Sequence, residues 1–108
     1  MATLKMATIC GHTNTVKAVS DGMETHVTIT TSCHKIQSWG TDFVFPMEDM
    51  MNIQNKTFEE KGKACPLTPT CFVPTLVMNT VWLENGMISK NLVKKMGGMN
   101  IEYLEQDE

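Results

Sequence analysis

Sulfur and imidazole side chains occur in three short groups along this chain of 108 residues. Cys10 and His12 belong to a Cys-Gly-His triplet, Cys33 comes just before a second histidine, and Cys65 and Cys71 enclose a loop that contains two prolines. Thiolates and imidazoles bind zinc and iron–sulfur clusters, and a thiolate is also the nucleophile of disulfide exchange. These residue types therefore predict a thiolate site that either binds a metal or takes part in redox chemistry.

Two of the cysteines fall where helices are expected to begin. Ser32, a favoured N-cap residue, precedes Cys33 and predicts a short helix over residues 33–39. Cys71 comes just before Pro74, and proline is tolerated in the first turn of a helix. The unpaired N–H groups at a helix start favour a negative charge and so enrich thiolate. Cys33 and Cys71 are therefore the first candidates for a functional role, with a buried structural role as the alternative.

The remaining ligands come from turns and loops. Cys10 ends the first expected strand beside a glycine, which allows a ligand to approach closely, and His12 can chelate together with it. We predict a metal site with Cys10, Cys33 and Cys71 as ligands, completed by Cys65 or His12. The sequence has neither the Cys-x2-Cys pairs of structural zinc sites nor the cysteine run of ferredoxins. The spacing therefore leaves both zinc and an iron–sulfur cluster open as the cofactor.

Motifs of several other chemistries are missing from the sequence. It has no glycine-rich phosphate loop, no Gly-x-Ser-x-Gly elbow and no His-Glu-x-x-His motif, and its carboxylates show no spacing typical of a general acid and base. We therefore assign no catalytic residue, and whether the chain is an enzyme stays open. Two alternatives to a metal carrier or accessory protein remain. One is a thiol redox protein that uses a cysteine pair, and the other is a protein-interaction module with inert buried cysteines and a surface built around Met47, Met50 and Met51.

Length and composition are those of one globular domain, which we expect to span residues 1–108. Hydrophobic residues make up 42% of the chain and charged residues 19%, so a core can form without a metal. The formal net charge is −3 and all nine basic residues are lysines, which argues against a nucleic-acid partner but leaves room for a protein partner. Because neither a signal-like segment nor a run of about 18 apolar residues occurs, we expect a cytoplasmic protein with reduced thiols and no contact with a membrane.

Alternation of apolar and polar residues predicts a three-stranded antiparallel meander from about residue 3 to residue 31. Its strongest signal is Asp21-Gly22, because glycine accepts the positive φ of a tight hairpin turn. Residues 99–104 predict a last strand that joins the meander. We therefore expect an α+β fold: an antiparallel sheet of three N-terminal strands plus a C-terminal strand, with helices packed on one face. This topology would gather Cys10, Cys33 and Cys71 at one end of the sheet.

Helices are expected between the meander and the last strand. The longest follows the two-proline loop and ends at Asn85-Gly86, and its apolar stripe consists of Pro74, Val77, Met78, Val81 and Trp82. A capping box formed by Thr57 and Glu60 predicts a helix that runs to about Ala64. Further short helices are expected within residues 33–39, 47–51 and 87–95, and residues 43–46 are expected to form a connection.

The order of these segments resembles an uncharacterised family of small cysteine-containing proteins from methanogenic archaea and other anaerobes. The resemblance rests on Cys10-Gly-His, on a strand that ends in Thr-Ser-Cys33, on Cys71-Phe-Val-Pro before a helix, on a Gly-Met-Ile-Ser-Lys segment and on the final strand. It implies roles for Cys10, Cys33 and Cys71 and an anaerobic setting, in which iron–sulfur chemistry is common, but it supplies no activity. Phe72 stands where the family pattern has proline, and Cys65 has no counterpart, which argues against a site of four cysteines.

Overall fold

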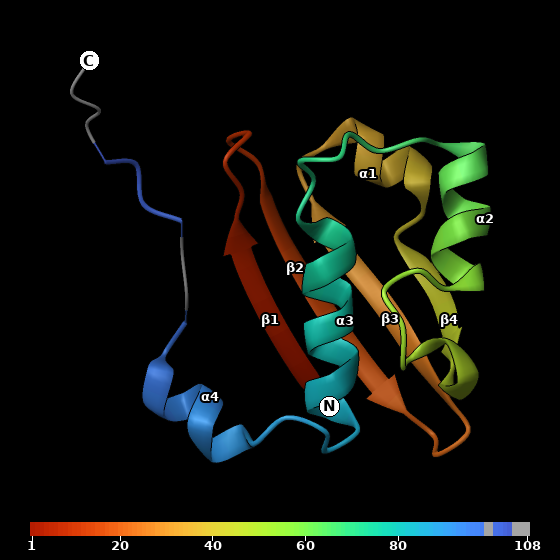
Figure 1. Ribbon diagram of the computed structural model, residues 1–108, viewed down its shortest axis with the longest axis vertical. Coiled ribbons are helices and arrows are strands. Elements are labelled where there is room, and N and C mark those ends of the chain that lie inside the picture. The colour runs from red at the N-terminus through yellow and green to blue at the C-terminus, as the bar shows by residue number, and fades with distance from the viewer. Residues whose placement is uncertain (99–100, 105–108) are drawn as a thin grey trace.

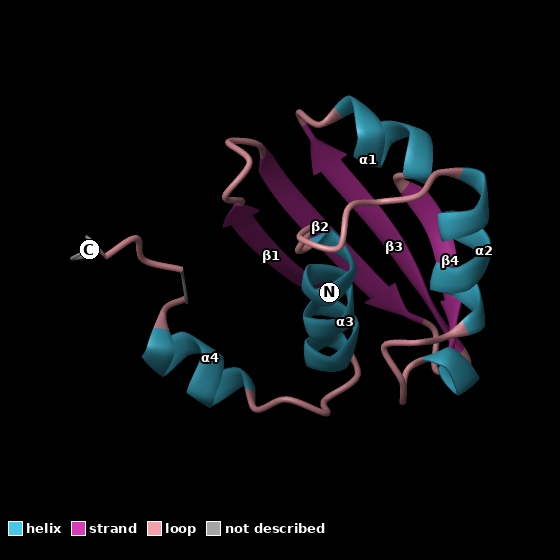
Figure 2. Cartoon of the chain, turned by 45° about the horizontal axis from the view of Figure 1, so that its top comes forward, coloured by secondary structure: helices cyan, strands magenta, loops and turns pink. Residues whose placement is uncertain are grey.

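The structure, a computed structural model, describes residues 1–98 and 101–104 and has a four-stranded antiparallel sheet with helices packed against it (Figure 1). The strands are β1 (Ala2–Ala7), β2 (Thr13–Ser20), β3 (Glu24–Thr31) and β4 (Asp42–Pro46). The helical elements are α1 (His34–Trp39), the 3-10 turn η1 (Met47–Asp49), α2 (Lys56–Ala64), α3 (Val73–Glu84) and α4 (Lys90–Met96). Each strand pairs with its neighbour in the sequence, so the sheet is a meander (Figure 2).

The first three strands form the meander that the alternation predicts. In the turn between β2 and β3, Gly22 has a φ of 97°, a conformation that residues with a Cβ rarely adopt. The Asp21 carboxylate accepts hydrogen bonds from the backbone N–H groups of Met23 and Glu24, each at 2.9 Å. These two hydrogen bonds hold the pKa of Asp21 below its usual value. The turn therefore places β2 and β3 in register.

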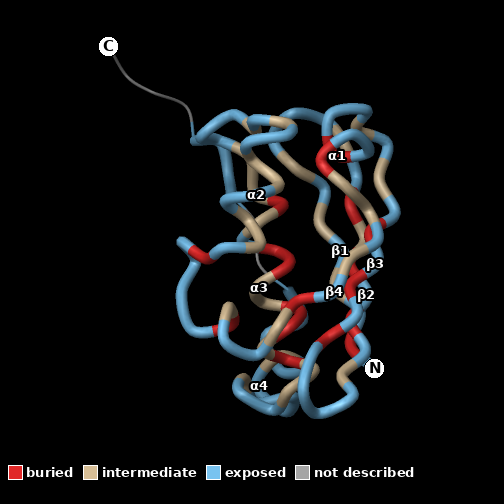
Figure 3. Tube along the Cα trace, turned by 90° about the vertical axis from the view of Figure 1, so that its right-hand side faces the viewer, coloured by how far each residue is buried: buried red, intermediate tan, exposed pale blue. Residues whose placement is uncertain are grey.

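One face of the sheet carries the core, and the other faces solvent. Val16, Val27, Ile29 and Phe45 are buried, and each is followed by a more exposed residue. This period of two is the pattern of a sheet with one covered face. In Figure 3 the sheet is seen from its side, with α2 and α3 on the same side of it. The expected α+β fold with helices on one face is therefore confirmed.

Helix α3 packs across β1, β2 and β3 and begins where the sequence predicts. Its buried residues differ in part from the predicted apolar stripe, because they begin at Val73 and leave Pro74 half-buried. The half-buried Met78 and Trp82 flank these buried residues. The residues buried along α3 are Val73, Leu76, Val77, Thr80, Val81 and Leu83.

The fourth strand does not come from the C-terminus. β4 pairs with β3 in antiparallel register, with Phe45 opposite Thr25, although residues 43–46 were expected to be a connection. Of the expected last strand, residues 101–104 are not in a strand, and residues 99 and 100 lie outside the described part of the chain. The position beside β3 is occupied by β4, because the short α1 returns the chain directly to that edge.

Helix α2 closes the core over β4, and its cap differs from the predicted one. The N-cap is Asn55, whose side-chain oxygen accepts a hydrogen bond from the Phe58 N–H at 2.9 Å. The Thr57 hydroxyl instead donates to the Asp49 carboxylate at 2.6 Å. The centre of the Phe58 ring lies 5.3 Å from the centre of the Phe45 ring, so α2 packs directly on β4.

The shorter helices largely follow the expectations. Residues 47–49 form a single 3-10 turn instead of a helix that reaches residue 51. α4 is capped by Ser89 and ends at Gly97, which has a φ of 72°. Within the part of the chain that the structure describes, no helix has the length and apolar content needed to cross a membrane.

Candidate functional site

Turns and loops at one end of the sheet enclose a cavity of about 230 Å³. Its lining comes from the turn between β1 and β2, from the start of α1 and from the loop that leads into α3. Cys10, His12, Cys33 and Cys71 all contribute to this lining. Antiparallel pairing explains their meeting, because the end of β1 and the end of β3 lie at the same end of the sheet. Three cysteines far apart in the sequence thus face one cavity.

Cys10 lies in the turn of residues 8–12 and not at the end of a strand, because β1 already ends at Ala7. Gly11 has a φ of 89°, and its N–H donates to the Thr8 carbonyl oxygen at 2.9 Å. The exposed Cys10 Sγ lies 2.9 Å from the Thr8 hydroxyl oxygen. The hydrogen bond with this hydroxyl and one from the His12 N–H lower the pKa of Cys10 below its usual value. The turn therefore presents an accessible thiol enriched in thiolate.

Cys33 is itself the N-cap of α1, where the sequence predicts Ser32. Its backbone N–H donates to the Thr31 hydroxyl oxygen at 3.0 Å, and that hydroxyl donates to the Asn14 side-chain oxygen at 2.5 Å. Asn14 is buried, with 1% of its surface exposed, and lines the same cavity. Two successive hydrogen bonds thus fix the half-buried Cys33 relative to both β2 and β3.

Cys71 is half-buried just before α3, and its N–H donates to the Thr68 carbonyl oxygen at 3.0 Å. Burial raises the pKa of the Cys71 thiol, and a hydrogen bond from the Val73 N–H opposes this effect. Negative charge on Cys10 and on Cys33 raises the pKa further, whereas the Lys35 ammonium lowers it. Charges on two other cavity-lining cysteines therefore act on Cys71.

The two candidates for a further ligand differ in position. His12 lines the cavity, and its Nδ1 forms a 3.0 Å hydrogen bond with the Ser32 hydroxyl. Cys65 is the C-cap of α2, and its thiol donates to the Lys35 carbonyl oxygen at 3.5 Å. It is not among the residues that line the cavity. The structure therefore separates Cys65 from the other three cysteines.

Across residues 1–98 and 101–104, no group of three or more Cys, His, Asp or Glu side chains is already arranged to hold a metal ion. A common coordination sphere would require a change in the conformation of the segments that carry Cys10 and Cys71. Both belong to segments without regular secondary structure, the turn of residues 8–12 and the loop before α3. The present geometry is one of neighbouring free thiols.

Four supporting residues were not singled out from the sequence. Thr8 hydrogen-bonds the Cys10 sulfur, Asn14 and Thr31 hold Cys33 in place, and Lys35 places a positive charge at the cavity. A threonine two residues before a cysteine in a turn is a detectable signal, because hydroxyls there bond to nearby groups. Asn14 also stands out, because it is a polar residue at an inward-facing position of an alternating strand.

We expect the Thr8 hydroxyl to raise the reactivity of Cys10 at neutral pH. A lowered pKa gives more thiolate at pH 7, and this effect fades as the pH rises above the pKa of ordinary thiols. Substitution of Thr8 by valine removes the hydrogen bond to the sulfur and is expected to slow the alkylation of Cys10 at pH 7 several-fold. Mass spectrometry after timed iodoacetamide labelling measures the rate at each cysteine. Equal Cys10 rates in the wild type and the variant would contradict the role of Thr8.

Comparison with known proteins places the chain in one family. No curated protein and no solved structure matches it. The sequence model of DUF6951, a family of unknown function, matches residues 4–96, a segment that contains all four cysteines. Because the match covers well over half of the chain, the protein belongs to this family of unknown function, DUF6951.

Proposed function

We propose that the protein binds a thiophilic metal ion or an iron–sulfur cluster in the cavity, with the thiolates of Cys10, Cys33 and Cys71 as ligands. The observation that carries the proposal is that three cysteines from three separate segments line one cavity. Its role is to carry the metal or to assist another protein, since we assign no catalytic group. The site works in the cytoplasm, where thiols are kept reduced.

The chemistry of the donors supports this proposal. Thiolates are soft ligands that favour zinc, copper(I) and iron–sulfur clusters over magnesium or calcium. Metal binding deprotonates thiols, and the positive charge of the ion offsets the repulsion that raises the pKa of Cys71. The His12 imidazole can supply Nε2 as a fourth ligand while Nδ1 keeps its hydrogen bond with Ser32. Cys65 is left out of the ligand set because it does not line the cavity.

An iron–sulfur cluster is the form of the site that an anaerobic organism would favour. The cavity volume of about 230 Å³ leaves room for more than a single ion beside the three sulfur atoms. An origin in methanogens or other anaerobes, suggested by the resemblance of the cysteine motifs, agrees with such a cluster. Zinc bound by three thiolates and His12 is the alternative occupant.

Titration of the reduced, metal-free protein with Co²⁺ under anaerobic conditions tests the proposal. Cobalt bound by thiolates shows sulfur-to-metal charge-transfer absorption, and its visible bands distinguish tetrahedral from octahedral coordination. We expect charge-transfer bands that saturate at one Co²⁺ per chain, together with tetrahedral visible bands. A spectrum that stays that of hydrated Co²⁺ would rule out a thiolate metal site.

A thiol redox function is the second candidate, because Cys10 and Cys71 have opposite pKa shifts beside the same cavity. In this reaction the Cys10 thiolate attacks a substrate disulfide, forms a mixed disulfide and releases one substrate thiolate. The Cys71 thiolate then attacks the Cys10 sulfur and releases the second, so that the substrate gains two electrons and a Cys10–Cys71 disulfide forms. Thiol counts before and after mild oxidation test this reaction. A loss of two thiols with a Cys10–Cys71 peptide link supports it, and an unchanged count excludes it.

A further inference from the structure

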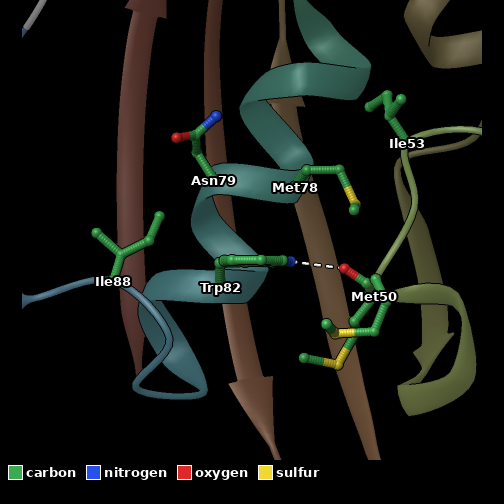
Figure 4. A pocket seen from close by; sticks show the side chains of 7 residues that line it. Met50, Ile53, Met78, Asn79, Trp82 and Ile88 are labelled. Atoms are coloured by element: carbon green, nitrogen blue, oxygen red, sulfur yellow. Dashed lines mark hydrogen bonds between the residues drawn. The ribbon is translucent and has the colours of Figure 1, made fainter.

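An apolar groove of about 250 Å³ lies far from the cysteines, between α3 and the segment that follows η1. Trp82 lies across it, and the indole N–H donates to the Met50 carbonyl oxygen at 2.6 Å (Figure 4). Met51, Met78 and Ile53 line the groove together with Ile88, which comes from the connection between α3 and α4. Met51 is 68% exposed and Ile53 is 50% exposed, although both are large apolar side chains. Such a surface is typical of a binding site for another polypeptide.

The second surface without a partner is α4. This helix has no buried residue, although Leu92, Val93 and Met96 lie at helical spacing on one side of it. Leu92 is 55% exposed and Met96 is 67% exposed. The apolar side chains continue after the helix, where Ile101, Tyr103 and Leu104 are also exposed. A helix of seven residues is too short to be stable in water by itself, so α4 needs a surface on which to pack.

We propose that α4 of one copy binds in the apolar groove of a second copy, and that the exchange is reciprocal. The groove and α4 are the two halves of a helix-in-groove contact, and one chain carries both. Figure 1 shows α4 beyond the β1 edge of the sheet, on the opposite side of α3 from residues 50–53. In this conformation α4 does not occupy the groove of its own chain, whereas a two-fold axis lets each copy fill the groove of the other.

Charge also favours this pairing. α4 carries Lys90, Lys94 and Lys95 and no acidic residue. The exposed Glu48 lies two residues before the groove residue Met50. A basic helix that approaches this carboxylate associates faster and in a preferred orientation. The dimer is consequently expected to weaken as salt is added.

Sedimentation velocity of the metal-free full chain, over a range of concentrations, tests the proposal independently of the metal site. We expect the wild type to be a dimer at high concentration. The double substitution of Leu92 and Met96 by serine and the single substitution Met51→Glu should each weaken the dimer at least about tenfold, because each removes apolar contact area. The control is Val19→Ser, since Val19 is 44% exposed on the solvent-facing side of β2, the side of the sheet opposite to α3.

A mixture of the two kinds of variant distinguishes reciprocal exchange from other dimers. The helix variant retains an intact groove and the groove variant retains an intact α4, so a mixed dimer keeps one of the two contacts. We expect the mixture to dimerise more strongly than either variant alone. A wild type that stays monomeric at all concentrations overturns the proposal, whether α4 then binds its own groove or a different protein. A wild-type dimer that persists unchanged in both variants overturns it as well.

Discussion

Replacement of Cys10, Cys33 or Cys71 by serine lowers the affinity of the protein for Co²⁺ by at least roughly a hundredfold, whereas Cys65→Ser leaves it unchanged. Loss of a group that only orients a ligand already costs about 10- to 100-fold in metal affinity, so loss of the ligand itself costs more. Serine keeps the size of the side chain but does not ionise at neutral pH and is a harder donor. Competition with a chelator of known affinity measures each dissociation constant.

Cys65 is the matched control because it shares the chemistry of the other three cysteines but not their location. It is half-buried, as are Cys33 and Cys71, but it does not line the cavity, and its thiol bonds to the Lys35 carbonyl oxygen. Any general effect of removing a thiol should therefore appear in Cys65→Ser as well. Equal losses in all four variants would show that Co²⁺ binds to thiols without regard to the cavity, which would contradict the proposed site.

Truncation of Phe45 to alanine destabilises the fold by about 3–5 kcal/mol, the range measured for large-to-small substitutions of buried aromatic residues. Phe45 has no exposed surface, and its ring lies 5.3 Å from that of Phe58 on α2. The substitution leaves a cavity where β4, β3 and α2 meet. Equilibrium unfolding in urea, monitored by tryptophan fluorescence and far-UV circular dichroism, gives the free energy of unfolding.

Val44→Ala is the control for this prediction, because Val44 is the preceding residue of β4 and points to the outer face. It is 45% exposed, so its truncation should cost less than about 1 kcal/mol. A large difference between the two variants tests the alternation of a strand in residues 42–46. Equal and small effects would show instead that this segment is a surface connection.

The meander and α3 were predictable because their signals are local. Asp21-Gly22 specifies a tight turn, and the alternation on both sides of it specifies the covered face. β4 was missed because its few residues before Pro46 show no clear alternation, and their pairing with β3 depends on how α1 turns the chain. The expected last strand illustrates the reverse error, because residues 101–104 are not in a strand although β1 lies at an edge of the sheet. Strand propensity alone does not make a strand.

The gathering of the cysteines could be predicted from topology, because a hairpin turn and the end of the next strand share one end of a sheet. The identity of the N-cap residue of α1 could not be predicted from the sequence. Ser32 and Cys33 are adjacent, and the hydrogen bond from the Cys33 N–H to the Thr31 hydroxyl decides which of them caps the helix. The sequence also could not predict that Cys65 does not line the cavity. Its position depends on the path of the two-proline loop, and no sequence pattern fixes the direction of such a loop.

Metal content after anaerobic purification tests most directly whether the three thiols form a coordination site. We expect stoichiometric iron with inorganic sulfide, or stoichiometric zinc, in the wild type, and neither in a variant with Cys10, Cys33 and Cys71 all replaced by serine. Elemental analysis and the visible absorption spectrum of the same samples give both values. A wild type that contains neither iron nor zinc, and in which all four thiols react freely, would contradict the proposed coordination site.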